Sequence, residues 1–284
     1  MLNRLFPFLM LLLALVSCGR RTGHDARPVV TASIVPLASF VEAIAGERFA
    51  VTPLVPPGAG PETYEPSPRQ MVELNASRIL FRIGTLGLER TRLEKMAETA
   101  PDLLVVDASR GITPLAAGQC AGQAADGSDQ HTWTSPANAK IMGRNICKAL
   151  CRVDSAHAPA YERRLARFEA HADSIDAAIR QRLQSVTHRT FLIAHPALGY
   201  FARDYGLRQL SVEADGKEPS PERLAALVEQ CRAEGVRVVF VQKEHPGRAA
   251  RRIAAELGLP VVEIDPLSSR WGAELIRIAD ALAR

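Results

Sequence analysis

The sequence predicts an α/β protein of two Rossmann-like lobes with parallel sheets, joined by one long rigid helix. Apolar side chains such as Tyr161, Phe168 and Ile175 recur at steps of three and four through residues 159–186, with charged residues between them. This pattern indicates one amphipathic helix, roughly 40 Å long, which is more than a small domain needs. On both sides of it, short apolar segments alternate with helical ones, as in α/β folds. A single large domain crossed by this helix is the alternative.

Each half of the chain alternates strands with helices. Runs such as Leu103 to Val106 are continuously apolar, which is typical of parallel strands covered on both faces. The first half predicts strands at residues 29–34, 49–55, 78–83 and 103–107 and helices at residues 37–45, 68–75, 88–98 and 135–152. The second half predicts strands at residues 190–194, 208–212, 236–242 and 260–264 and helices at residues 197–205, 221–234, 247–257 and 270–283. We therefore expect an N-terminal lobe at residues 28–157, a connecting helix at residues 158–187 and a C-terminal lobe at residues 188–284.

The first residues are predicted to be a signal peptide rather than part of the fold. Residues 5–16 form an apolar run that is too short to span a membrane and has the right length for the core of a signal peptide. The run ends in Leu15-Val16-Ser17-Cys18-Gly19, which resembles a bacterial lipobox. We expect residues 1–18 to be a lipoprotein signal peptide, Cys18 to carry the lipid and residues 19–27 to form a tether. The protein would then lie on the periplasmic or cell-surface side of a bacterial membrane, anchored by lipid.

Composition argues against a nucleic-acid partner. The chain has 35 Lys and Arg residues against 31 Asp and Glu residues, and no basic run is interleaved with aromatic residues. Nothing in the sequence indicates an oligomer, so we expect a monomer.

Four cysteines remain after Cys18, namely Cys120, Cys147, Cys151 and Cys231. An oxidising compartment permits disulfides, and four cysteines allow three full pairings. Cys147 and Cys151 lie four residues apart on a predicted helix, so either one could face Cys120. The pairing stays open. A metal site at this pair is disfavoured because no second Cys or His pair lies nearby.

Polar residues that follow the predicted strands are the candidates for a binding site. Glu62 lies in a proline-rich loop after the second strand, and His131 lies at the end of the long loop after the fourth. His195, Glu213 and Asp265 follow strands of the second half. In open α/β sheets, ligands bind beyond the carboxyl ends of the strands. Two histidines with two or three carboxylates suit a divalent transition metal, held in the cleft between the lobes.

The other histidines are interpreted as surface or capping residues; they are His24, His157, His171, His188 and His245. An enzyme is the competing class, because two His and a carboxylate around zinc with a spare Glu would describe a hydrolase. The sequence has no His-Glu-x-x-His helix, no Gly-x-Ser-x-Gly elbow and no glycine-rich phosphate loop. A fully protein-ligated metal also lacks the open position that chemistry requires. We therefore expect a binding protein rather than an enzyme.

Six segments carry a resemblance to a known family: Val55-Pro56-Pro57-Gly58, Thr63-Tyr64-Glu65-Pro66-Ser67-Pro68, His131-Thr132-Trp133, Ala194-His195-Pro196-Ala197-Leu198-Gly199-Tyr200-Phe201, Glu218-Pro219-Ser220-Pro221 and Ile264-Asp265-Pro266-Leu267. Over nearly the whole mature chain, the sequence resembles the zinc and manganese solute-binding proteins of bacterial ABC importers. The resemblance implies two α/β lobes joined by one long helix, with a metal ion between them on side chains from four loops.

The resemblance implies metal ligands at His131, His195 and Asp265. The family usually has a His where Glu62 stands, so we expect Glu62 to be a ligand with oxygen in place of nitrogen. Glu213 stands where manganese-binding members have a Glu ligand, which makes it a possible ligand or supporting residue. The His-rich loop that is common in zinc-binding members is absent, because residues 118–130 contain no His.

The predicted function is capture of a divalent metal, zinc foremost, and its delivery to an ABC permease and its ATPase. Mn²⁺ and Fe²⁺ are the alternative ions. A two-lobe receptor for a chelated metal or an organic cofactor is a further alternative, and it would need an aromatic-lined cleft. An adhesive lipoprotein would tolerate loss of His195. Because metal ligands must be deprotonated, affinity should fall as the pH drops through the range in which His titrates.

Overall fold

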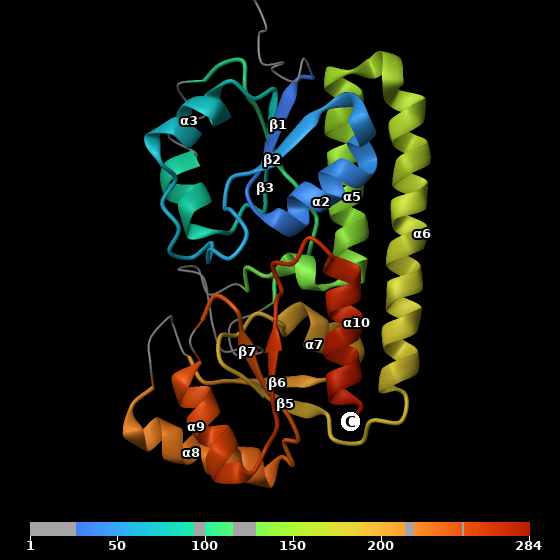
Figure 1. Ribbon diagram of the computed structural model, residues 1–284. Helices are drawn as coiled ribbons and strands as arrows, with labels where there is room; N and C mark the ends of the chain where they lie inside the picture. The colour runs from blue at the N-terminus through green and yellow to red at the C-terminus, as the bar shows by residue number, and fades with distance from the viewer. Residues whose placement is uncertain (1–26, 94–99, 116–128, 214–218, 246) are drawn as a thin grey trace, which may run out of the picture.

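The computed structural model describes residues 27–93, 100–115, 129–213, 219–245 and 247–284. Two lobes are stacked end to end, and one long helix, α6 (Ala158–Leu183), runs along the side of both (Figure 1). This confirms the predicted α/β architecture of two lobes joined by a long helix. The predicted signal peptide, the lipidation site at Cys18, the tether up to residue 26 and Cys120 lie outside the described residues.

Each lobe is built on a parallel sheet. The first sheet has the strand order β2 (Ala50–Pro53), β1 (Val29–Ala32), β3 (Ile79–Arg82) and β4 (Leu104–Asp107). The second has the order β6 (Arg208–Ser211), β5 (Thr190–Ile193), β7 (Val239–Gln242) and β8 (Val261–Ile264). Every paired strand within a sheet is parallel. The carboxyl ends of the strands therefore gather at one edge of each sheet, where ligands bind in such folds.

The helices lie close to their predicted positions. They are α2 (Val35–Ala45), α3 (Pro68–Asn75), α5 (Pro136–Val153), α7 (Gly199–Tyr205), α8 (Pro221–Ala233), α9 (Arg248–Leu257) and α10 (Trp271–Leu282). Of the helix predicted at residues 88–98, the structure describes a stretch of π-helix at Glu89–Leu93. Strand β7 begins three residues later than predicted, because the Val236 amide donates to the Cys231 carbonyl and closes the end of α8.

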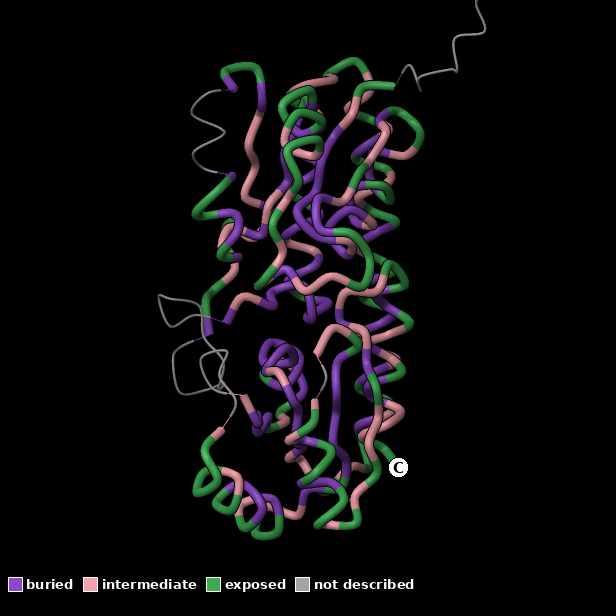
Figure 2. Tube along the Cα trace, turned by 60° about the vertical axis from the view of Figure 1, so that its left-hand side comes forward, coloured by how far each residue is buried: buried purple, intermediate pink, exposed green. Residues whose placement is uncertain are grey.

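Helix α6 packs against α2 and α5 in the first lobe and against α10 in the second. Its buried residues follow the predicted periodicity: Tyr161, Phe168, Ala172, Ile175, Ile179 and Leu183. Figure 2 shows buried and exposed positions alternating along the helices at the edge of the molecule. The helix is therefore held by core contacts in both lobes.

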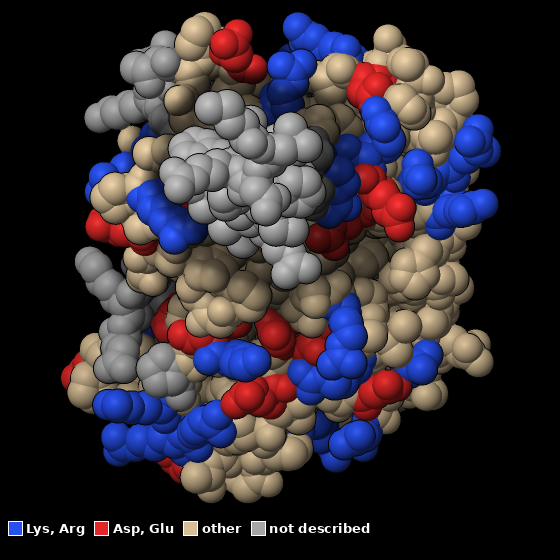
Figure 3. Space-filling view, turned by 45° about the horizontal axis from the view of Figure 1, so that its top comes forward, with Lys and Arg blue, Asp and Glu red and all other residues tan. Residues whose placement is uncertain are grey.

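The seam between α5 and α6 is close. A Cβ atom added at Gly143 would lie 2.9 Å from two ring carbons of Phe168. Ion pairs of 2.6 Å, Lys140 with Asp173 and Arg144 with Glu169, flank the seam at the surface. Exposed pairs of this kind contribute about 0–1 kcal/mol each, so apolar packing dominates here. Basic and acidic side chains are also interspersed on the face of the molecule shown in Figure 3.

Two tryptophans join the lobes. The indole N–H of Trp133, from the first lobe, donates to the Pro266 carbonyl of the second lobe at 2.9 Å. The indole N–H of Trp271 donates back to the Trp133 carbonyl at 2.6 Å. Trp271 also packs edge-on against Phe40 of α2, with ring centroids 5.0 Å apart. Because both indoles are buried, these contacts fix the position of one lobe against the other.

None of the helices in the described part of the chain combines the length and the apolar character needed to cross a membrane. Among the described cysteines, Cys147, Cys151 and Cys231 are free thiols. The sulfur atoms of Cys147 and Cys151 lie 3.9 Å apart on one face of α5.

Substitution Gly143→Leu should lower the free energy of unfolding by about 1–3 kcal/mol, because the added side chain overpacks the seam with Phe168. Urea denaturation measures the change. Gly87→Ala is the control, since Gly87 is exposed and an added Cβ there meets no atom within 4 Å. It should change the free energy by no more than about 0.5 kcal/mol. Equal urea midpoints for Gly143→Leu and Gly87→Ala would contradict the close packing of α5 on α6.

Candidate metal centre

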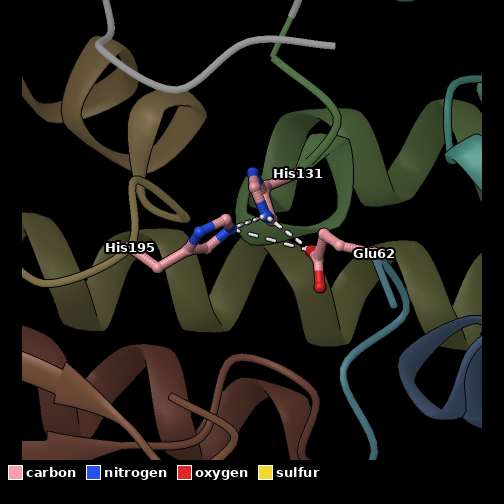
Figure 4. A group of neighbouring side chains, drawn as sticks. All are labelled: Glu62, His131 and His195. Atoms are coloured by element: carbon pink, nitrogen blue, oxygen red, sulfur yellow. Dashed lines mark hydrogen bonds and ion pairs between the residues drawn. The ribbon is translucent and has the colours of Figure 1, made fainter. Parts of the chain in front are cut away.

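Three side chains from three loops converge between the lobes (Figure 4). Glu62 follows β2, His131 precedes α5 and His195 follows β5. The Nε2 atoms of the two histidines lie 3.3 Å apart, and they lie 3.6 and 3.7 Å from Oε1 of Glu62. Two ligands that each bind a metal ion at about 2.1 Å with tetrahedral geometry are separated by about 3.4 Å. The three donor atoms therefore already have the spacing that a divalent cation requires.

The loop that carries Glu62 is tied down at its far end. Ser67 caps α3 and forms a reciprocal capping box with Gln70. Gln70 also accepts a hydrogen bond from the Tyr64 hydroxyl at 2.8 Å and donates to the Leu54 carbonyl at 2.9 Å. These bonds join the loop to its own start and end. They fix the segment that directly follows Glu62.

His131 is oriented by Asp129. The buried Asp129 carboxylate accepts from Nδ1 of His131 at 2.8 Å and from the backbone N–H of the same residue, also at 2.8 Å. A ligating His commonly donates its second ring N–H to a carboxylate, which fixes the tautomer and directs the other nitrogen at the metal. In this way Nε2 of His131 points at Glu62 and His195. The spacing of an Asp two residues before a His also allows an Asx turn, which is a signal visible in the sequence.

His195 is held from two sides. The side chain of Gln242, at the end of β7, accepts from the His195 amide at 3.2 Å and donates to the His195 carbonyl. Oε2 of Glu213 lies 3.0 Å from Nδ1 of His195, on the opposite side of the ring from Nε2. Glu213 is therefore placed behind His195 as a supporting residue, while the Nε2 atom faces the donor cluster.

His245 lies beside the site although its sequence position suggested a helix cap. Gly247 is the N-cap of α9, and the ring of His245 stacks on His195 with centroids 4.4 Å apart and an interplanar angle of 5°. Donor atoms of His195, Glu213 and His245 come within 4.8 Å of one another. The lone pairs of the ring nitrogens lie in the ring planes, and the planes of His195 and His245 are nearly parallel. The two rings therefore cannot both direct a lone pair at one ion. We interpret His245 as a packing partner of His195.

Asp265 is the predicted ligand that the structure does not bring into the cluster. Neither close group of donor atoms among the described residues contains its carboxylate. Its backbone N–H donates to Glu274 at 2.7 Å, and burial together with the charge of Glu274 raises the pKa of Asp265. The next two residues, Pro266 and Leu267, line the same small pocket as the cluster. Asp265 therefore precedes two residues of the pocket in the chain and stays a predicted ligand.

The cluster has strongly coupled charges. Burial opposes ionisation of Glu62, but its contact with His131 and the charges of both histidines outweigh burial and lower the pKa of Glu62 to about 2. Burial also opposes the charge of His131, yet Asp129 and Glu62 raise the pKa of His131 to about 9. At neutral pH and without a metal ion, a protonated His131 therefore faces an ionised Glu62.

Residues 30–277 match the profile of the family described as zinc-uptake complex component A, periplasmic (ZnuA). The chain belongs to this family. Its members are extracytoplasmic metal-binding proteins that supply ABC transporters, so the protein is a binding protein and not an enzyme.

Similar proteins cover most of the chain. A putative metal-binding protein of Treponema pallidum (strain Nichols) is 31% identical over 270 residues, which are 90% of this chain and 84% of that protein. The iron-binding protein YfeA of Yersinia pestis is 29% identical over 258 residues, covering 88% and 81%. A crystal structure of ZnuA superposes with a TM-score of 0.84 at 33% identity, covering 90% of this chain and 98% of that one.

Glu213 could support His195 or bind the metal directly, and substitution should have different effects in the two cases. If it supports His195, Glu213→Ala should lower metal affinity about 10- to 100-fold, the usual effect of removing such a partner. Glu213→Gln should retain most of the affinity, because an amide oxygen still accepts the bond from Nδ1 of His195. Isothermal titration of both variants checks this. Equal losses in the two variants would instead identify Glu213 as a direct ligand.

Proposed function

We propose that the protein captures a divalent transition metal ion, zinc foremost, outside the cytoplasm and passes it to the permease of an ABC importer. The observation that carries the proposal is the convergence of Glu62, His131 and His195 at the spacing of a coordinated ion. Asp265, next to the pocket, is proposed as the fourth ligand. The ion is cargo, so the donors must both hold it and release it.

Zinc is favoured by the two imidazole nitrogens, because tetrahedral sites of His with carboxylate are typical of Zn²⁺. The family is described by zinc uptake, which supports the same ion, while the Yersinia pestis relative is named for iron. Mn²⁺ and Fe²⁺ are the alternatives, since carboxylate oxygens suit both. The direct approach of three donor atoms supports a bare ion rather than a chelate or an organic cofactor.

Delivery completes the proposal. We propose that Cys18 bears the lipid that keeps the protein at the periplasmic or cell-surface side of the membrane, close to the permease and its ATPase. We also propose that the protein acts as a monomer, because both lobes of one chain supply donor atoms to the site.

Metal content of the chelator-stripped protein lacking residues 1–18 is the first test. The parent should bind one Zn²⁺ per chain. His195→Ala should lower the affinity at least about tenfold, or about 1.4 kcal/mol, and Glu62→Ala should also weaken it. His171→Ala is the matched control, because His171 is exposed on α6 and should leave affinity unchanged. A parent that binds no metal tightly, or equal affinity in His195→Ala, would refute the proposed function.

Affinity should depend steeply on pH. A proton and the metal ion compete for Nε2 of His131, whose pKa is raised to about 9. Below that pH, affinity should rise about tenfold for each unit of increasing pH, and it should level off above it. Competition with a chelating dye, corrected for protonation of the dye, measures the slope. Asp129→Asn removes a group that raises the pKa of His131, so in this variant the rise of metal affinity with pH should level off at a lower pH. Equal parent affinity at about pH 6 and about pH 8 would contradict proton competition at His131.

A further inference from the structure

Glu244 lines the pocket that contains the donor cluster. It lies on the loop after β7, two residues beyond Gln242. Its Oε1 atom is fully buried and accepts no hydrogen bond from any described residue. Buried carboxylate oxygens normally have partners, so this oxygen is left with an unmet demand for a positive or hydrogen-bonding group.

The loops that carry Glu62 and Glu244 meet at Gly60. A Cβ atom added at Gly60 would lie 3.3 Å from Oε2 of Glu62 and 3.9 Å from Cβ of Glu244. Gly60, Glu62 and Glu244 all line the pocket. Glu62 and Glu244 therefore come from opposite lobes and lie on either side of Gly60 at the pocket.

The surroundings of Glu244 are acidic. Burial is the main cause that raises the pKa of Glu244, and the charges of Asp265 and Glu62 add to it. A hydrogen bond from its own backbone N–H and the charge of Lys243 oppose this rise only in part. Among the described residues, Glu244 forms no ion pair with a Lys or Arg. A cation in the pocket would supply the missing partner for the buried oxygen and would screen the repulsion between the carboxylates.

We propose that Glu244 is a further metal ligand, recruited by ions that need more than four donors, so that the same centre takes Mn²⁺ or Fe²⁺ as well as Zn²⁺. Zn²⁺ is satisfied by four ligands, whereas Mn²⁺ favours octahedral coordination rich in oxygen. Glu62, Asp265 and Glu244 with two imidazoles supply five donors. This inference rests on the proposed function, with Glu62, His131, His195 and Asp265 as the basic set.

Glu213 does not fit this role. Its carboxylate contacts Nδ1 of His195 and lies 3.8 Å from Nδ1 of His245, behind the ring whose Nε2 faces the pocket. It also does not line the pocket. Of the two glutamates that follow strands of the second lobe by two residues, only Glu244 lines the pocket that contains the cluster.

The affinities of Glu244→Gln for Mn²⁺ and Zn²⁺, measured by competition with a chelating dye, test the inference. Affinity for Mn²⁺ should fall at least about tenfold while affinity for Zn²⁺ changes less than about threefold, because only the larger ion uses the fifth donor. Glu213→Ala should lower both affinities alike. Glu65→Gln removes an exposed carboxylate of the Glu62 loop and should alter neither. The inference would be overturned if Glu244→Gln changed the affinities for Mn²⁺ and Zn²⁺ by the same factor, or if the parent did not bind Mn²⁺.

Absorption of the Co²⁺-loaded protein gives a second readout. The visible bands of Co²⁺ strengthen as its coordination number falls to four. Glu244→Gln should therefore intensify them relative to the parent, and an unchanged spectrum would overturn the inference. Circular dichroism confirms that the variant is folded. If the parent binds neither Zn²⁺ nor Co²⁺, the proposed function itself fails. If the parent binds both ions, but Glu244→Gln changes neither the Co²⁺ spectrum nor the ratio of Mn²⁺ to Zn²⁺ affinity, only the role of Glu244 fails.

Discussion

The fixed relation between the two lobes is the constraint on which the metal centre depends. Neither lobe alone supplies the site, because Glu62 and His131 come from the first and His195 comes from the second. Productive ligand geometry has to be kept within about 0.5 Å. Helix α6 is buried against both lobes, and the reciprocal bonds of Trp133 and Trp271 cross the junction close to the ligands. The core that holds the fold together therefore also sets the distances between the donor atoms.

Carboxylates placed behind the histidines arrange the centre before any ion arrives. Asp129 holds Nδ1 of His131 and Glu213 holds Nδ1 of His195, so both Nε2 atoms face Glu62. The same arrangement stabilises a proton on His131. An incoming cation replaces this positive charge at nearly the same position. Loading the site therefore exchanges one cation for another and leaves the charge of Glu62 balanced throughout.

Much of this could be predicted from the sequence, because strand and helix periodicity depends on local pattern. The spacing of Tyr161, Phe168 and Ile175 predicts α6, and parallel strands predict that residues after the strand ends gather together. What the pattern does not contain is the direction of a side chain within a loop. Glu213 and Glu244 each follow a strand by two residues, yet one lies behind the ring of His195 and the other lines the pocket. That difference is set by tertiary contacts between loops that are distant in the chain.

The Glu at position 62 changes the charge of the loaded centre. With a divalent ion, the set of Glu62, Asp265 and two neutral imidazoles has no net charge, whereas a His at position 62 would leave one positive charge. Burying net charge is costly, so the neutral set suits a pocket lined by Trp133 and Leu267. An ionised Glu244 would add a negative charge to this neutral set. Its binding is therefore most favourable with an ion whose coordination shell is incomplete with four donors. The centre would then distinguish metals by the number of ligands that each ion needs, and not by electrostatic attraction alone.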